Sequence, residues 1–309
     1  MAFELEQSQP IRTTSSFQLA PSQCPHHCDA TTDEVLHRFG EFQISRCGAC
    51  GLVRLVPRLT ESELVELYER EYFSGDHAIG YDTYEQDASL YEKTFARRLK
   101  LIQSFKTSGR LLDIGCGLGF FLNVAARRGF DVQGLEMSAY AFERASAGFP
   151  GRIHQGLLVP GLFPAESFDI VTLFDVFEHV YEPRGFIRIL DEITNDDAIV
   201  CITTPNHRSL LSRVSGRNWI SYKIPEHVFY YTPETLRRMV EPLFEIVLLR
   251  SEGQYCTLEF LAERLKTLIR PLGSTLLQTV RALHISKWPI YINSGSMTVI
   301  LKKRERTAH

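Results

Sequence analysis

The sequence lacks any run of about 20 apolar residues, the length that a membrane-spanning helix needs. Its first ten residues carry Glu4 and Glu6 and no apolar stretch, so they do not resemble a secretory signal peptide. The formal net charge is only −3, which gives no reason to expect a general nucleic-acid or membrane-surface binder. We therefore expect a cytoplasmic protein with neither a membrane nor a nucleic-acid partner. The sequence leaves the oligomeric state open.

Cysteine is scarce outside one short region. Cys116, Cys201 and Cys256 are scattered in apolar surroundings, where a buried free thiol is the simplest interpretation. The other four cysteines fall between positions 24 and 50. In a reducing cytoplasm, such a cluster indicates a metal site and not disulfides.

The clustered cysteines form two close pairs, Cys24–Cys28 and Cys47–Cys50, which could together close a tetrahedral Zn²⁺ site. The second pair is followed by Gly51, and this C-x-x-C-G pattern is typical of a zinc knuckle. The first pair is one residue longer than usual, so His27 could replace Cys28 as a ligand. Four protein ligands would leave no open position, so the zinc would be structural. Reduced free thiols and a redox disulfide are the alternatives.

The composition changes along the chain predict four regions. Residues 1–22 are rich in Ser, Thr, Gln and Pro and are expected to be a disordered tail. Residues 23–57 form the zinc-ribbon-like segment, and residues 58–106 a helical lid or linker. The main domain occupies residues 107–309 and contains a helical insertion over residues 257–284.

In the main domain, apolar strand-like stretches alternate with helical patterns. Strands are expected over residues 110–115, 131–136, 152–155, 168–175, 198–204, 244–250 and 297–302. Such alternation predicts a doubly wound α/β fold, with a mostly parallel seven-stranded sheet covered by helices on both faces.

A glycine-rich turn follows the first of these strands. The segment from Leu111 to Gly119 places glycines in the spacing G-x-G-x-G, with Asp113 two residues before the first glycine. The second strand ends at Glu136, whose carboxylate could accept hydrogen bonds from ribose hydroxyls. The fingerprint of dinucleotide-binding proteins is instead G-x-G-x-x-G, and Asp113 would repel the pyrophosphate of a dinucleotide. A carboxylate here suits a cationic amino-acid group and a sulfonium.

This segment resembles the cofactor-binding motif of class I S-adenosylmethionine (SAM)-dependent methyltransferases. The resemblance runs over about residues 100–250 and is strongest to the methyltransferase-23 and ubiquinone-type O-methyltransferases. It implies a Rossmann-like methyltransferase fold. It also implies a set of residues that contact SAM at its methionine end, at its ribose and beside the fourth strand: Asp113, Gly115, Cys116, Gly117, Glu136, Met137, Phe174 and Asp175.

An acidic and histidine-containing cluster follows the fourth strand. Asp175, Glu178, His179 and Pro183 resemble the D-x-x-E-H-x-x-x-P stretch of the same enzymes. Some members use E-x-x-E-H and a distant histidine, here His227, to bind a divalent cation, but Asp175 is shorter than glutamate. Three interpretations stay open: Mg²⁺ or Mn²⁺ ligation, a metal-free active site with His179 or His227 as general base, and purely structural hydrogen bonding.

The cysteine segment resembles the zinc-binding N-terminus, C-P…C-x-x-C-G-L, of some methyltransferases, including sugar C-methyltransferases. The two resemblances imply methyl transfer from SAM to an oxygen or carbon of a small-molecule acceptor such as a sugar, a quinone or a phenolic natural product. Two other functions compete with this one: a nucleotide-dependent oxidoreductase, and a non-catalytic protein that binds SAM or mediates interactions through zinc. The sequence does not identify the acceptor.

Overall fold

The computed structural model describes residues 18–26, 28, 33–60, 62–64, 66–67 and 88–304. His27, most of the predicted tail, and residues 61, 65 and 68–87 of the predicted lid over residues 58–106 lie outside the described residues. In the part of the chain that is described, no helix combines the length and the apolar character that crossing a membrane requires.

A seven-stranded sheet forms the centre of the main domain, in the order β12-β13-β10-β9-β6-β7-β8. The pairs from β8 to β10 are parallel, and β13 runs antiparallel to both of its neighbours. The predicted mostly parallel, seven-stranded sheet is therefore confirmed. Its strands are β6 (Arg110–Ile114), β7 (Asp131–Glu136), β8 (Ile153–Gln155), β9 (Phe168–Phe174), β10 (Thr194–Pro205), β12 (Phe244–Thr257) and β13 (Pro289–Lys303).

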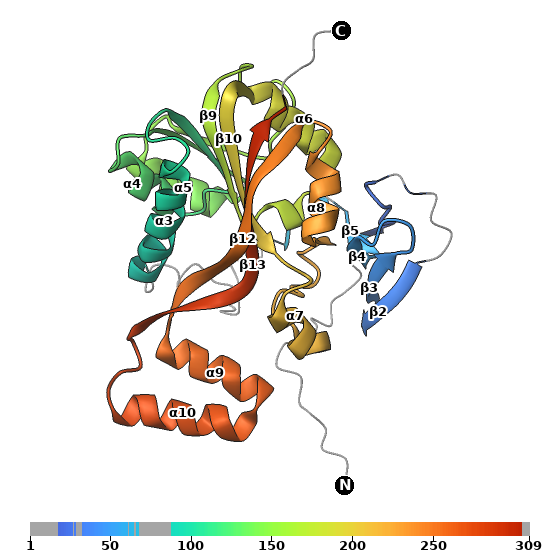
Figure 1. Cartoon of the computed structure of the whole chain (residues 1–309), viewed down its shortest axis with the longest axis vertical. Coiled ribbons are helices and arrows are strands. Elements are labelled where there is room, and N and C mark those ends of the chain that lie inside the picture. The colour runs from blue at the N-terminus through green and yellow to red at the C-terminus, as the bar shows by residue number, and fades with distance from the viewer. Residues whose placement is uncertain are drawn as a thin grey trace.

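Helices cover both faces of this sheet. Figure 1 shows α3, α4 and α5 on one side and α6 and α8 on the other. Successive residues of one central strand enter different cores: Ile170 belongs to the cluster under α3 and α4, whereas Val171 belongs to the cluster under α6 and α8. This double burial explains the continuous apolar run in the sequence. The helices are α3 (Ala88–Gln103), α4 (Phe120–Ala126), α5 (Ala139–Gly148), α6 (Pro183–Ile193), α7 (Leu210–Ser215), α8 (Pro233–Val240), α9 (Leu258–Leu268) and α10 (Arg270–Ala282).

Local capping explains where several helices begin. The Ser138 hydroxyl accepts a hydrogen bond from the backbone of Ala141 at the start of α5. Thr232 and Thr235 form a reciprocal capping box at the start of α8, where Pro233 occupies the first turn. Since proline lacks the N–H that a first turn leaves unpaired, it fits there without loss. These caps fix the helices that border the carboxyl ends of the strands.

The N-terminal segment folds as a second, smaller sheet that also recruits a strand from the main domain. Its order is β11-β4-β3-β2, formed by β2 (Asp33–Phe39), β3 (Phe42–Cys47), β4 (Val53–Val56) and β11 (Phe229–Tyr230). A separate two-stranded sheet pairs β1 (Leu19–Ala20) with β5 (Arg58–Leu59), so two residues of the expected tail form a strand.

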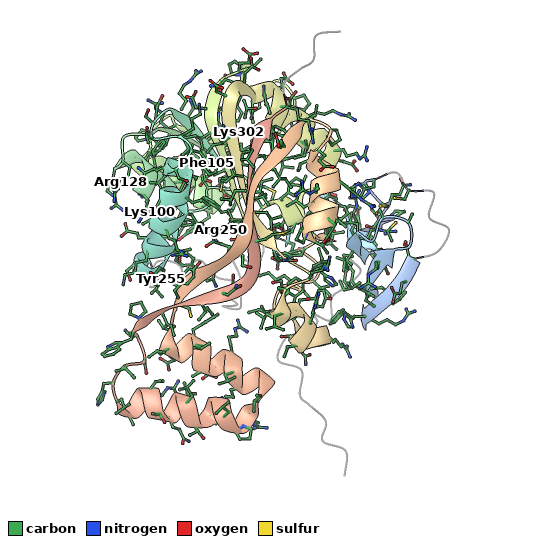
Figure 2. The ribbon with its side chains drawn as sticks, in the orientation of Figure 1. Lys100, Phe105, Arg128, Arg250, Tyr255 and Lys302 are labelled. Atoms are coloured by element: carbon green, nitrogen blue, oxygen red, sulfur yellow. The ribbon has the colours of Figure 1, made fainter. Side chains whose placement is uncertain are left out.

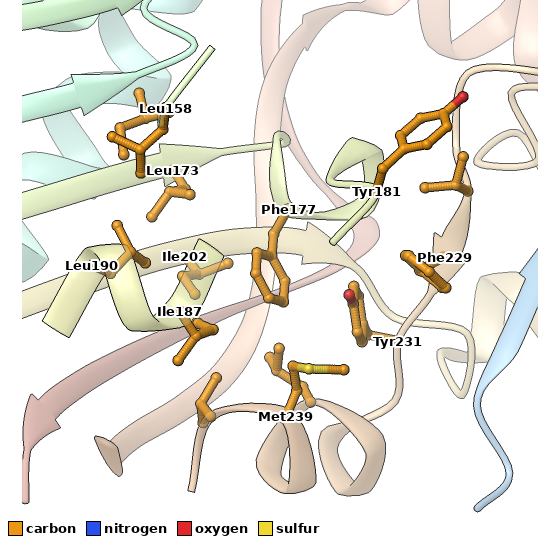
Figure 3. Packing of buried hydrophobic residues seen from close by; sticks show 14 of the residues in the cluster. Leu158, Leu173, Phe177, Tyr181, Ile187, Leu190, Ile202, Phe229, Tyr231 and Met239 are labelled. Atoms are coloured by element: carbon orange, nitrogen blue, oxygen red, sulfur yellow. The ribbon is translucent and has the colours of Figure 1, made fainter. Parts of the chain in front are cut away.

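One hydrophobic core joins the small sheet to the main domain. Ile44 and Leu55 of the small sheet belong to the same buried cluster as Phe177 and Met239. In Figure 3, Phe229 and Tyr231 lie between Tyr181 and Met239 and face the side chain of Phe177. The rings of Phe177 and Tyr231 stack with their centroids 5.1 Å apart. The small sheet is therefore anchored beside the turn that follows β9.

The two last strands are longer than the sequence predicted. Strands were expected over residues 244–250 and 297–302, whereas β12 and β13 stay paired from Phe244 opposite Lys303 to Thr257 opposite Pro289. Half of the β12–β13 ribbon extends beyond the sheet, where its residues need not be apolar. Residues 251–254 are polar, so the sequence pattern did not predict this continuation. Figure 1 shows α9 and α10, within the expected insertion, at the far end of this ribbon.

Candidate active site

Three glycines shape the turn between β6 and α4. Gly115, Gly117 and Gly119 have φ angles of 71°, 54° and 77°. These angles lie in the left-handed region, where a Cβ atom is unfavourable by about 1–2 kcal/mol. The turn lies where the chain order switches from β8 back to β9 on the other side of β6, which is where doubly wound sheets bind ligands.

The structure distinguishes two of these glycines. A Cβ atom on Gly115 would lie 2.5 Å from Cγ2 of Val176, whereas a Cβ atom on Gly117 would meet no protein atom within 4 Å. We expect Gly115→Ala to destabilise the fold more than Gly117→Ala. Both variants place a Cβ atom on a left-handed backbone, but only Gly115→Ala also creates a steric clash. Urea unfolding of both variants measures this difference, and equal unfolding free energies would contradict it.

Asp113 is buried beneath the turn, with 3% of its surface exposed. Its Oδ1 accepts a hydrogen bond of 2.6 Å from the hydroxyl of Thr172 on β9. Burial raises the pKa of Asp113 to about 7, although the Thr172 hydrogen bond opposes this shift. The site therefore contains a carboxyl group that a nearby cation would stabilise in its charged form.

Glu136 links the end of β7 to the glycine turn. Its Oε2 accepts a 2.8 Å hydrogen bond from the Gly117 amide, and its Oε1 accepts one of 2.8 Å from the Ser138 amide. Burial raises the pKa of Glu136, while these backbone amides lower it. Beside it, Met137 is half-buried, and the Cys116 thiol packs against Gly134 on the sheet side of the turn. The structure thus brings Glu136 and Gly117 into direct contact.

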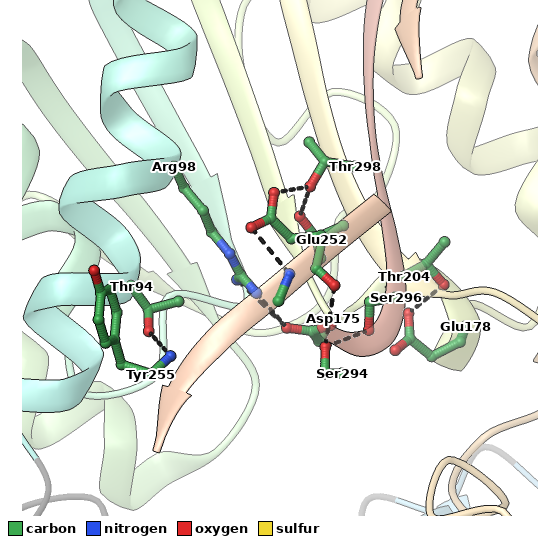
Figure 4. A network of polar contacts seen from close by, with 12 residues as sticks. Thr94, Arg98, Asp175, Glu178, Thr204, Glu252, Tyr255, Ser294, Ser296 and Thr298 are labelled. Carbon is green, nitrogen blue, oxygen red and sulfur yellow. Dashed lines mark hydrogen bonds and ion pairs between the residues drawn. The ribbon is translucent and has the colours of Figure 1, made fainter. Parts of the chain in front are cut away.

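Asp175 directly follows β9 and has a left-handed conformation, with a φ of 59°. Its Oδ2 lies 3.4 Å from both terminal nitrogens of Arg98, which reaches it from α3 (Figure 4). The Arg98 guanidinium also lies over the Phe174 ring, 4.8 Å from its centroid. Sequence reasoning missed Arg98, because an arginine on an amphipathic helix usually faces solvent, whereas here it is 5% exposed.

The three predicted catalytic residues lie together. Nε2 of His227 is 4.0 Å from Oε1 of Glu178, and the rings of His179 and His227 have centroids 4.5 Å apart. Their candidate ligand atoms all lie within 4.8 Å of one another. The Thr204 hydroxyl donates a 2.9 Å hydrogen bond to Oε2 of Glu178. Asp175 is not part of this group, because its carboxylate faces Arg98.

Burial controls protonation in this group. It raises the pKa of Glu178 to about 8, and the neighbouring Asp175 carboxylate adds to that shift. It lowers the pKa of His179 and of His227, and the Lys223 ammonium lowers both further. Both imidazoles are therefore neutral near pH 7, which is the form that accepts a proton.

The four clustered cysteines also lie together. The Sγ of Cys24 is 3.9 Å from that of Cys28 and 3.4 Å from that of Cys50. All four sulfurs, with that of Cys47, lie within 4.8 Å of one another. Sulfurs bound to one Zn²⁺ at about 2.3 Å lie about 3.8 Å apart in a tetrahedron, so this arrangement fits the ion.

The protonation of the thiols follows their surroundings. Burial raises the pKa of Cys24 and of Cys50 to about 11. Burial has the same effect on Cys47, but the backbone amides of Cys50 and Ala49 outweigh it and lower the pKa to about 7. These amides point at the sulfur as a zinc knuckle requires, and they favour the thiolate form of Cys47.

A separate cleft of about 790 Å³ lies between α3, α4 and β12. Figure 2 labels Lys100, Arg128 and Tyr255 on this side of the molecule. None of the predicted site residues lines the cleft, so it does not belong to the site described above. Its lining includes five basic side chains: Lys93, Arg97, Lys100, Arg127 and Arg128.

The fold and site define a class of protein. A doubly wound sheet with a reversed β13, a glycine turn after β6 and a carboxylate at the end of β7 is the architecture of class I methyltransferases. The model of the methyltransferase domain family matches residues 67–243, more than half of the chain. The chain belongs to this family, which confirms the predicted resemblance.

Curated relatives cover part of the chain. A ubiquinone biosynthesis O-methyltransferase of Neisseria meningitidis is 29% identical over 150 residues, which are 42% of this chain and 60% of the relative. A mitochondrial enzyme of the same name from Schizosaccharomyces pombe is 31% identical over 132 residues, covering 40% of this chain and 46% of the relative. The match thus spans about half of each relative.

Solved structures support the fold. A Haloferax volcanii methyltransferase, solved in complex with the Trm112 methyltransferase activator, is similar with a TM-score of 0.54 and 13% identity. The similarity covers 74% of this chain and 98% of that one. At this identity, the likeness concerns the arrangement of the elements and not the substrate.

Proposed function

We propose that this protein transfers the methyl group of SAM to an oxygen atom of a small molecule. One observation carries the proposal: the glycine turn with Asp113 and Glu136 lies at the same edge of the sheet as the Glu178, His179 and His227 group. The first set suits a cationic nucleoside, and the second can accept a proton. The names of the curated relatives favour a hydroxyl on a quinone or phenol ring, and a sugar hydroxyl or a carbon centre is the second candidate.

Each residue has a role that follows from its place. The Asp113 carboxylate would attract the positive charges of SAM, and Glu136 would accept hydrogen bonds from the ribose hydroxyls. Bound SAM supplies an activated methyl group, so the protein must orient the acceptor and remove its proton. Orientation contributes about 7–11 kcal/mol. The neutral His227 imidazole takes the proton, and Glu178, held by Thr204, would stabilise the imidazolium in its ionised form, which prevails above its pKa of about 8.

We propose that this proton transfer needs no divalent cation. Two imidazoles and one carboxylate offer few oxygen ligands, whereas Mg²⁺ and Mn²⁺ prefer mostly carboxylate, carbonyl and water oxygens. The residue that could add a second carboxylate, Asp175, faces Arg98 instead. The arrangement therefore supports a general-base site more than a magnesium or manganese site.

We further propose that Cys24, Cys28, Cys47 and Cys50 bind a structural zinc ion. Four thiolates complete its coordination and leave no position for a substrate. A protein with this site and three other buried thiols suits the reducing cytoplasm. Metal analysis of protein purified without chelator tests the proposal, and a zinc content near zero would contradict it.

Two measurements test the proposed reaction. Calorimetry with SAM, its demethylated product and NADH should show binding of the first two and none of the third. Incubation with labelled SAM and a metabolite extract should then yield a labelled small molecule. Binding of NADH alone would favour an oxidoreductase, and SAM binding without transfer to any acceptor would favour a non-catalytic protein.

A further inference from the structure

The strand that follows the candidate catalytic histidine belongs to the cysteine-bearing sheet. β11 begins two residues after His227 and pairs with β4, placing Tyr230 opposite Val53. β4 in turn pairs with β3, which ends at Cys47. The segment that carries His227 therefore continues into the outer strand of a sheet whose other strands come from residues 33–56.

Two backbone hydrogen bonds hold the residue next to His227 from opposite sides. The amide of Val228 donates to the carbonyl of Glu178 over 3.0 Å, and the carbonyl of Val228 accepts from the amide of Leu55 over 3.0 Å. Val228 is fully buried, and His227 is 3% exposed. A shift of β4 would therefore displace the residue that sets the distance between His227 and Glu178.

Two residues of the cysteine cluster, Cys47 and Cys50, lie at the turn that precedes β4. The Cys47 amide donates to the Leu52 carbonyl and the Gly51 amide donates to the Cys47 carbonyl, both over 2.9 Å, so the chain turns tightly between β3 and β4. Cys50 lies in this turn, with its sulfur 3.4 Å from that of Cys24. A metal ion bound to both would cross-link the turn to a part of the chain more than 20 residues earlier.

We infer that the metal-bound cysteine cluster positions His227 for proton transfer, acting through β4, β11 and Val228. The inference rests on the proposed function, because it assigns His227 a role that depends on its distance from Glu178. The groups expected to bind SAM lie on or directly after β6, β7 and β9 in the other sheet. Metal loss should therefore alter the surroundings of His227 and leave SAM binding intact.

Nuclear magnetic resonance of the full chain tests this without an acceptor. The histidine rings are labelled with ¹³C, and the signals of His227 and His154 are assigned with His227→Gln and His154→Gln. His154 lies on β8, in the other sheet, and serves as the internal control. We expect the His227 signal to shift or broaden when a chelator removes the metal and to recover when ZnCl₂ is added, while His154 stays unchanged.

A matched pair of variants separates positioning from folding. Cys47→Ser should reproduce the changed His227 signal, whereas Cys256→Ser, at a buried cysteine outside the cluster, should not. The SAM Kd should change by less than about twofold in both, which is about 0.4 kcal/mol. An unchanged His227 signal after metal loss would overturn the inference, as would a parallel loss of the His154 signal and of SAM binding. If His227→Ala keeps full activity while the His227 signal of the wild-type protein still follows the metal, the proposed catalytic role fails and the coupling stands.

Discussion

His227→Ala should lower kcat by about 10²–10⁴-fold, the usual contribution of a positioned general base. The imidazole is buried, neutral and 4.0 Å from Glu178, so among the described residues its removal leaves His179 as the neutral base beside Glu178. The SAM Kd should stay within about twofold of the wild-type value, because Asp113 and Glu136 are unchanged. Single-turnover methyl transfer with labelled SAM and calorimetry measure the two quantities separately.

Two further variants interpret that result. His154→Ala removes a histidine from β8, which is an edge strand separated from β9 by β6 and β7, and should keep wild-type kcat. His179→Ala should cost less than His227→Ala, since Nδ1 of His179 already contacts the Glu226 carbonyl at 3.1 Å. Unchanged turnover in His227→Ala would remove this residue from the mechanism. A larger loss of turnover in His179→Ala than in His227→Ala would make His179 the general base.

The sequence predicts the parts of the site that depend on local pattern. The glycine turn, Asp113 and Glu136 lie within 24 residues of one another and sit on strands with clear apolar runs. The approach of His227 to Glu178 was predicted only through a family resemblance, because nothing local links residues so far apart. The structure supplies the physical link: Val228 pairs with the turn after β9 and with β4.

Features that depend on distant pairing were missed. Arg98 gave no signal, since its burial comes from Asp175 and Phe174, which lie at the end of β9, more than 70 residues later in the chain. The addition of β11 to the small sheet was equally hidden, because a two-residue strand has no periodicity of its own. Likewise, the outer half of β12 carries Glu252, a buried carboxylate that accepts hydrogen bonds from Tyr291 and Thr298 on the partner strand. Figure 4 shows the contact with Thr298. A polar strand of this kind can be predicted only when the strand that pairs with it is known.

Asp113→Asn should weaken SAM binding by about 10–100-fold, or about 1–3 kcal/mol, because it removes a negative charge from the cofactor site. Asparagine can keep the hydrogen bond from Thr172, so the shape of the turn should survive. The demethylated product lacks the sulfonium charge, and its affinity should fall less than that of SAM. Calorimetry with both ligands measures the difference, and an equal loss for the two would show that Asp113 does not sense the sulfonium.

The same substitution should stabilise the ligand-free protein at high pH. Burial raises the pKa of Asp113 from 3.8 to about 7, so between these values the folded state binds more protons than the unfolded state. The free energy of unfolding of the wild type therefore falls as pH rises through this window, by at most about 4 kcal/mol from this group. Asp113→Asn removes that loss.

We therefore expect the variant to be more stable than the wild type at about pH 8 and similar to it at about pH 4. Urea unfolding at the two pH values measures this, with Asp131→Asn as the control. Asp131 begins the neighbouring strand with its side chain half exposed, and should show no such gain. A variant that is less stable at both pH values would mean that Asp113 is held by more than the Thr172 bond. If Asp113→Asn binds SAM more weakly and is also more stable, then the Asp113 carboxylate lowers the stability of the ligand-free protein and is kept for cofactor binding. The reason would be that its cationic partner is present only when SAM is bound.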